Sequence, residues 1–191
     1  RDTTGGNDKR LKFDFDLQAC RSLTGVPINL GTDAGGIGLS LDASAIIDLS
    51  AIDAGAMELK LSRLDVATIL QSAAEKLSPA MIRRDQTLSI ELAEDSLSFV
   101  GDTMRVEQII ANLLSNAIGF SARGSQIRMG ARRTGTNIQI WIADSGRGID
   151  PEFQKKAFER FQSKPLPGSH RGPGLGLAIV KSFTELHGGN V

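Results

Sequence analysis

Two asparagines, Asn112 and Asn116, are spaced one helical turn apart in a stretch of apolar residues. That spacing places both side-chain amides on the same side of a helix. Carboxamide oxygens are hard ligands of the kind that Mg²⁺ prefers. A pair of asparagines can also simply face solvent, so this spacing alone leaves both interpretations open.

A second group with chemical potential is the sequence DSGRGI, which directly follows the apolar stretch IQIWIA. Its carboxylate, Asp144, can accept a hydrogen bond from an exocyclic amine such as that of adenine. Gly146 and Gly148 allow the backbone to approach a flat base because they have no Cβ. The alternative is an ordinary glycine-rich turn ending at Ile149.

The third group is the sequence GPGLGL, in which Gly172, Gly174 and Gly176 alternate with Pro173, Leu175 and Leu177. Glycines that precede a helix offer backbone N–H groups and the positive end of a helix dipole to phosphates. The sequence is neither a Rossmann fingerprint, since no βαβ unit surrounds it, nor a Walker loop, since no Gly-Lys-Ser/Thr follows. A structural turn remains the alternative.

The fourth group is Phe158-Glu-Arg160-Phe161, within residues 151–171. This segment is rich in Pro and Gly and carries more Lys and Arg than Asp and Glu. A basic cover suits a polyphosphate. A solvated loop with incidental basic residues fits the composition equally well.

Helices and strands in a definite order must position these four groups. Apolar residues at i, i+3, i+4 and i+7 predict helices, and alternating residues predict strands. The predicted helices cover 41–59, 65–77, 102–120 and 174–187. The predicted strands cover 86–92, 97–100, 126–132 and 137–143. The order favours an α+β fold, a two-layer α/β sandwich with helices on one face of the sheet.

The composition restricts the function classes. The chain has 191 residues with 22 basic and 22 acidic side chains, so it lacks the positive charge of a general nucleic-acid binder. No apolar run is long enough to span a bilayer. A single cysteine, Cys20, excludes an internal disulfide, and we therefore expect a cytoplasmic location.

The order of the four groups resembles the asparagine, first glycine, phenylalanine and second glycine boxes of bacterial two-component sensor histidine kinases. In these kinases the boxes belong to an ATP-binding catalytic domain of the GHKL superfamily. The sequences around these boxes, such as EQIIANLLSNAI and GLGLAIVKSFTELHGG, also resemble those of that family. The resemblance covers roughly residues 59–191. It implies a Bergerat-type fold with a mixed, mostly antiparallel sheet.

The resemblance also implies roles for single residues. Asn116, with help from Asn112, would coordinate Mg²⁺, Asp144 would hold adenine, and Phe120 would pack beside the base. Residues 151–171 would form a lid over ATP. The implied nucleotide site consists of Asn112, Asn116, Phe120, Asp144, Gly146, Gly148, Ile149, Arg160, Phe161, Gly172, Gly174, Leu175, Gly176 and Leu177.

Residues 1–58 are expected to hold a linker and part of a helical dimerisation hairpin, ahead of a catalytic domain over 59–191. Residues 41–58 resemble the second helix of that hairpin, and Arg10–Phe15 resembles the start of its first helix. The resemblance implies a homodimer and a response regulator as partner, with membrane contact only through other parts of a longer protein. The stretch between Phe15 and Asp48 is too short for two long helices, so we expect an incompletely represented hairpin.

The chain departs from the family's pattern at several positions. The family phosphorylates a histidine on the first hairpin helix, whereas the two histidines here are His170, in the lid, and His187, at a helix C-terminus where an imidazolium would suit the dipole. No catalytic residue can therefore be assigned. Gly119 and Pro173 replace a usual cation and a usual hydroxyl, which predicts altered ATP affinity.

Two other functions stay open at this level. One is a regulatory scaffold that binds ATP or a response regulator without phosphorylating itself. Such a scaffold would be a divergent member of the family. The other is a different GHKL ATPase, in which Glu107 would activate water. Glu107 lies five residues before Asn112, so its side chain is expected well around the helix from the asparagine pair.

Overall fold

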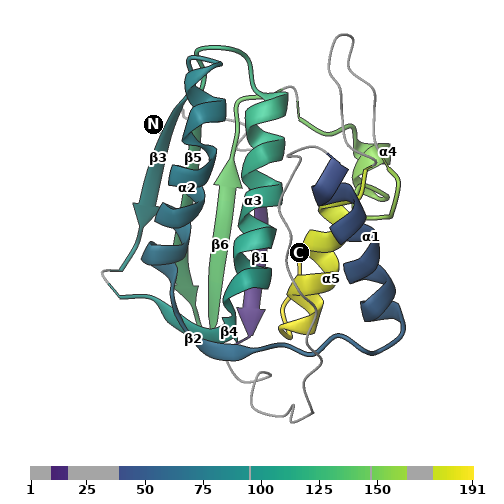
Figure 1. The fold of residues 1–191 in the computed structure, drawn as a ribbon. Helices are drawn as coiled ribbons and strands as arrows, with labels where there is room; N and C mark the ends of the chain where they lie inside the picture. Colours follow the sequence, from purple (N-terminus) through teal and green to yellow (C-terminus); the bar gives the residue numbers. More distant parts are fainter. Residues whose placement is uncertain (1–9, 17–38, 95, 147, 163–173) are drawn as a thin grey trace.

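A computed structural model of the chain describes residues 10–16, 39–94, 96–146, 148–162 and 174–191, with side chains from residue 45 onward. A four-stranded sheet is covered on one face by helices (Figure 1). In the order in which they lie in this sheet, the strands are β1 (Arg10–Asp16), β6 (Asn137–Ala143), β5 (Gln126–Thr134) and β3 (Thr87–Leu92). All neighbours are antiparallel except β3 and β5, which are parallel.

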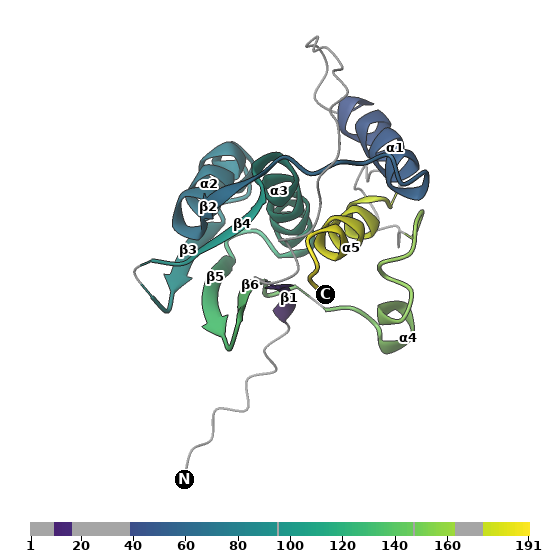
Figure 2. The ribbon, with the colours of Figure 1, turned by 90° about the horizontal axis from the view of Figure 1, so that it is seen from below.

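Two further strands form a separate antiparallel ribbon, β2 (Leu61–Asp65) with β4 (Ser98–Asp102). The helices are α1 (Leu39–Asp53), α2 (Val66–Ile82), α3 (Thr103–Phe120), the short α4 (Pro151–Gln154) and α5 (Gly176–Leu186). Seen from below, α2, α3 and α5 form one layer and the sheet the other, with α1 outside α5 (Figure 2). The predicted α+β two-layer sandwich with a mixed, mostly antiparallel sheet is confirmed.

Aspartates at the starts of α2 and α3 explain where these helices begin. Asp65 accepts a hydrogen bond from the Thr68 backbone N–H at 2.8 Å, and Asp102 accepts one from Arg105 N–H at 3.2 Å. Each bond satisfies a backbone donor that the first helical turn leaves without an intrahelical partner. Gly188, with φ of 74°, follows the end of α5 in the left-handed conformation that commonly terminates helices.

The core lies between the sheet and the three-helix layer. Its fully buried side chains recur with helical spacing on α3 and α5 and with alternate spacing on β5 and β6, as two amphipathic layers require. The largest of them are Leu70, Ile109, Ile110, Leu114, Ile127, Met129, Ile138, Ile140, Ile179 and Phe183.

The prediction that Arg10–Phe15 starts a helix is wrong, because these residues lie in β1. They pair antiparallel with β6, with Phe13 opposite Ile140. Apolar and charged residues alternate strictly in RLKFDFD, which is a strand pattern with a period of two. The structure also adds β2 and α4, which the sequence did not predict, and extends α2 to Ile82.

None of the helices in the described ranges is long and apolar enough to cross a membrane. Helix α1 ends at Asp53, before the predicted end at residue 59, and Gly55 follows it with a φ of 64°. Ala45 and Leu49 of α1 are buried in the core, beside α5. Dimerisation through residues 41–58, and the division of the chain at residue 58, stay predictions.

Candidate functional site

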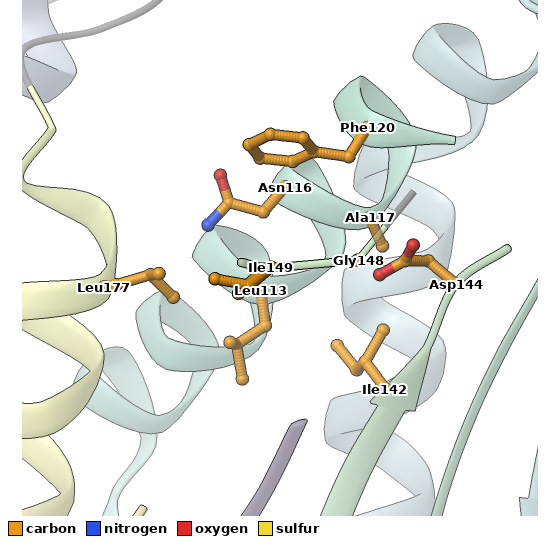
Figure 3. Close-up of a pocket in the computed structure, with 9 residues that line it drawn as sticks. All are labelled: Leu113, Asn116, Ala117, Phe120, Ile142, Asp144, Gly148, Ile149 and Leu177. Carbon is orange, nitrogen blue, oxygen red and sulfur yellow. The ribbon is translucent and has the colours of Figure 1, made fainter. Parts of the chain in front are cut away.

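A pocket opens between the C-terminal half of α3, the end of β6 and the start of α5 (Figure 3). Side chains of α3 form one wall, Leu177 of α5 faces them, and Ile142 and Asp144 approach from β6. The lining is mostly apolar, with one carboxylate and one amide. It consists of Leu113, Asn116, Ala117, Phe120, Ile142, Asp144, Gly148, Ile149 and Leu177.

Helix α3 contributes its residues by simple helical spacing. Asn116 and Phe120 are one turn apart and line the rim, where Asn116 is half-buried and Phe120 is 37% exposed. Leu113 and Ala117 are also one turn apart and are both buried. The helix thus presents an amide and an aromatic ring above an apolar floor.

The turn after β6 orients the carboxylate of Asp144. The Gly146 backbone N–H donates to Asp144 Oδ1 at 2.7 Å, which leaves Oδ2 for an incoming donor. A Cβ on Gly146 would lie 2.6 Å from Asp144 Oδ1 and 2.9 Å from the Phe120 carbonyl oxygen, so the turn needs glycine there. The Gly146 backbone thus packs closely against the end of α3, whereas its predicted approach to a flat base stays a prediction.

The glycine cluster reaches the asparagine helix. A Cβ on Gly176 would lie 3.4 Å from Asn112 Oδ1, so Asn112 touches the start of α5. Leu175 precedes the helix and is 3% exposed, and within the described part of the chain no side-chain hydrogen bond caps the start of α5. Uncapped N–H groups at a helix start are available to an anionic ligand.

Two predicted residues, Arg160 and Phe161, are not among the residues that line the pocket. The Arg160 guanidinium forms an ion pair with Asp53 of α1, and Phe161 is 65% exposed with a φ of 61°. Gly172 falls outside the described residues, as do residues 163–171 of the predicted lid. The structure therefore brings together the asparagine helix, the carboxylate turn and the glycine cluster.

Sequence reasoning missed three apolar pocket walls: Leu113, Ala117 and Ile142. Leu113 and Ala117 belong to the predicted apolar stripe of α3, and Ile142 belongs to the alternating pattern of β6. Their burial was therefore predictable, but the pattern does not distinguish a pocket wall from a core residue.

His187 lies at the C-terminus of α5, as expected, and it is a buried neutral imidazole and not the imidazolium that would suit the helix dipole. Its Nε2 lies 3.0 Å from the Asp102 backbone N, which can only donate, so Nε2 must accept. Its Nδ1 then carries the proton and donates to the Phe183 carbonyl at 2.6 Å. Burial is the main cause that lowers the pKa of His187. With both ring nitrogens bonded and 1% exposure, His187 serves the packing of α5 and not phosphoryl transfer.

Glu107 also faces away from the pocket. Its carboxylate accepts hydrogen bonds from Lys76 at 2.6 Å and from Ser72 at 3.2 Å, both on α2. It is therefore neutralised on the side of α3 that packs against α2, and it does not approach the pocket lining.

The pocket combines apolar side chains with one carboxylate, that of Asp144, and it borders the start of α5. An apolar lining with a few polar groups is typical of small-molecule sites. Among the described residues there is no group of three or more His, Cys, Asp or Glu side chains that could hold a metal ion. A divalent cation here would thus rely on amide oxygens such as that of Asn116 and on oxygens of the ligand.

Comparison with known proteins gives a consistent family. Residues 101–191 match the family described as histidine kinase-, DNA gyrase B- and HSP90-like ATPase. The chain is 34% identical over 144 residues to the sensor protein DivL of Caulobacter vibrioides, covering 75% of the chain and 18% of DivL. It is 36% identical over 148 residues to the sensor-like histidine kinase SenX3 of Mycobacterium tuberculosis, covering 76% of the chain and 36% of SenX3. The chain thus spans well under half the length of these curated relatives.

Solved structures agree. Full-length ShkA in complex with AMPPNP is similar with a TM-score of 0.66 at 25% identity, over 76% of this chain and 30% of that one. The histidine kinase AdeS of Acinetobacter baumannii has the same fold, with a TM-score of 0.62 at 22% identity over 76% of this chain and 66% of AdeS.

Proposed function

Because the chain belongs to the ATP-binding catalytic domains of sensor histidine kinases, we propose that it binds Mg·ATP in the pocket beside Asp144 and presents the γ-phosphoryl group to a histidine. The observation that carries the proposal is the convergence of Asn116, Asp144 and the start of α5 on a single pocket.

The carboxylate of Asp144 would select adenine. The Gly146 N–H holds one carboxylate oxygen, so the other is oriented to accept from the exocyclic amine of the base. Guanine carries a carbonyl oxygen at that position, which a carboxylate repels. Ile142, Ile149 and Leu177 supply apolar contact to the ring faces. We therefore expect ATP to bind more tightly than GTP.

The triphosphate would extend from the pocket toward the start of α5. There the uncapped N–H groups of Gly176 and Leu177 can donate to phosphate oxygens, and the helix dipole favours the negative charge. Mg²⁺, when bound, would neutralise charge on the phosphates, and the amide oxygens of Asn112 and Asn116 are the candidate protein ligands.

Phosphoryl transfer would need an acceptor histidine other than His187, whose ring nitrogens are both bonded in the core. We propose that the acceptor is presented by a helical hairpin, that two hairpins pair in a homodimer, and that a response regulator receives the phosphoryl group. The catalytic domain would contribute positioning and charge stabilisation, which are the main requirements of phosphoryl transfer. We propose the cytoplasm, where ATP is available, as the location.

Equilibrium titration with ATP, GTP and ADP in the presence of Mg²⁺ tests the binding step. We expect saturable binding of ATP, weaker binding of GTP, and loss of that preference in Asp144→Asn, which replaces a pure acceptor by a group with donors. Asn116→Ala should weaken ATP binding more when Mg²⁺ is present than when Mg²⁺ is chelated. No binding at millimolar ATP by the folded wild-type chain refutes the proposal.

A transfer assay with the full-length protein and labelled ATP tests the second step. Label on a histidine supports kinase activity. ATP binding without label on any histidine would instead identify a regulatory scaffold. Hydrolysis that depends on Glu107 would favour another GHKL ATPase, although its pairing with Lys76 and Ser72 counts against that role.

A further inference from the structure

Helix α1 makes a direct ionic contact with Arg160, which lies within the predicted lid, residues 151–171. Asp53, at the last residue of α1, binds Arg160 through both carboxylate oxygens, at 2.5 and 2.6 Å from the two guanidinium NH groups. The hydrogen bond with Arg160 is the main cause that lowers the pKa of Asp53, so the aspartate is ionised at neutral pH. A two-point contact of this kind fixes the orientation of the arginine as well as its position.

The residues that follow Arg160 connect this contact to the glycine cluster. Phe161 has a φ of 61°, a left-handed conformation that a bulky side chain adopts only under constraint, and its ring is 65% exposed. The Gln162 backbone lies against Gly174, where a Cβ would come within 2.8 Å of the Gln162 carbonyl carbon and oxygen. Gly174 itself has a φ of 76° and stands two residues before α5.

Helix α1 is itself fastened to the catalytic fold. Asp48 is 6% exposed and accepts hydrogen bonds from Arg105 at 3.0 Å and from Gln108 at 3.3 Å, both on α3. The Arg105 guanidinium also lies 5.0 Å from the ring centroid of Phe183 on α5. These contacts fix α1 against α3, so Asp53 at the end of α1 has a defined position from which it can bind Arg160.

We infer that Asp53 and Arg160 are positioning residues that link helix α1 to the phosphate end of the nucleotide site. The ion pair holds the left-handed Phe161, which places Gln162 against Gly174 and so fixes the N–H groups at the start of α5. The inference rests on the proposed nucleotide function. It makes the placement of α1 a determinant of nucleotide affinity.

The expected effect is modest, because both partners are partly exposed. Exposed ion pairs contribute little to stability because solvent screens them, so we expect a change in affinity of at most about fivefold. The direction is set by the geometry: without Asp53, the backbone at Phe161 can relax and the amides of Gly174 to Leu177 lose their fixed orientation. Asp53→Asn should weaken ATP binding by a factor of about three to five.

The direct test measures the ATP dissociation constant of the chain with Asp53→Asn, beside a matched control. Asp85→Asn removes a similarly short ion pair, Asp85 to Arg123 at 2.6 Å, which involves neither α1 nor α5. We expect Asp53→Asn to weaken binding and Asp85→Asn to leave it unchanged. Unchanged or tighter binding in Asp53→Asn, with a wild-type chain that binds ATP, overturns the inference and leaves the proposed function intact.

A second test separates positioning from a general loss of structure. Glycine adopts the left-handed conformation without strain, so Phe161→Gly should remove the dependence on the ion pair. Asp53→Asn should therefore have no further effect in the Phe161→Gly background. Hydrogen exchange at the amides of Gly174 to Leu177, in nucleotide-free protein, should accelerate in Asp53→Asn alone. Equal effects of Asp53→Asn in both backgrounds, or unchanged exchange, overturn the inference.

Discussion

Replacing Gly146 by alanine should weaken nucleotide binding by disturbing Asp144, while the fold remains. The φ of Gly146 is not in the left-handed region, so alanine meets no backbone penalty there; the obstacle is space. Its Cβ would lie 2.6 Å from Asp144 Oδ1 and 2.9 Å from the Phe120 carbonyl oxygen, both well inside contact distance. The turn must move, and the 2.7 Å bond from the Gly146 N–H to Asp144 is lost or lengthened.

The magnitude follows from that bond. Hydrogen bonds to charged groups contribute about 1.5–3 kcal/mol, and each 1.4 kcal/mol is about a factor of ten in affinity. Gly146→Ala should therefore raise the ATP dissociation constant by roughly ten- to a hundredfold. The loss should be smaller for GTP, since guanine has a carbonyl oxygen, and no amine, at the position that adenine's amine would occupy beside the carboxylate.

Gly119→Ala provides the matched control, because a Cβ there meets nothing within 4 Å. It lies inside α3, where alanine is favoured over glycine by about 0.5–1 kcal/mol, so it should raise the unfolding temperature without weakening ATP binding. Isothermal titration with ATP and GTP, together with thermal unfolding of each variant, gives the answer. If Gly146→Ala binds ATP within a factor of two of wild type, the assignment of Asp144 as an oriented acceptor is wrong.

Three further predictions concern residues outside the pocket. Burial lowers the pKa of His187 in the folded chain. Below about pH 6.5 the histidine is therefore protonated in the unfolded chain before it is protonated in the folded chain. Between pH 7.5 and 5.5 the free energy of unfolding in urea should fall by up to about 1.4 kcal/mol per pH unit. A His187→Asn variant should lose that part of the pH dependence; an unaltered pH profile would contradict it. Leu114→Ala should lower the free energy of unfolding by about 2–5 kcal/mol, because Leu114 is fully buried in the core. A loss below about 1 kcal/mol would contradict the burial of Leu114 in the core. Glu107→Gln should leave nucleotide binding and any hydrolysis unchanged, since its carboxylate contacts Lys76 and Ser72 on α2; a loss of hydrolysis would assign it a catalytic role.

Much of the fold was predictable because local chemistry fixes it. The start of α3 follows from Asp102, a side chain that can satisfy the first helical N–H groups. The strand β1 shows the opposite case. Leu11, Phe13 and Phe15 alternate with charged residues, yet the resemblance to a hairpin helix outweighed that pattern, and the resulting prediction was wrong.

Sequence patterns predicted those site residues whose position follows from their own helix or strand. Asn116 and Phe120 share a side of α3 by helical spacing alone, and Asp144 follows the end of a strand whose alternation is plain. Ile142 lines the pocket only because β6 lies beside α3 in the folded chain, which no local pattern states. Local geometry therefore predicts the polar groups of the pocket, whereas its apolar walls need the tertiary arrangement.

The ion pair between Asp53 and Arg160 shows what sequence patterns leave out. The two residues are 107 positions apart, and no periodicity connects them. The sequence assigned Arg160 to the nucleotide because it lies in the phenylalanine box within the basic segment 151–171, whereas in the structure its guanidinium is paired with Asp53 of α1. An arginine held by a carboxylate can still serve the nucleotide, but through the backbone that it orients. Its charge would act directly on a phosphate only if α1 released it, so the position of α1 determines which role Arg160 has.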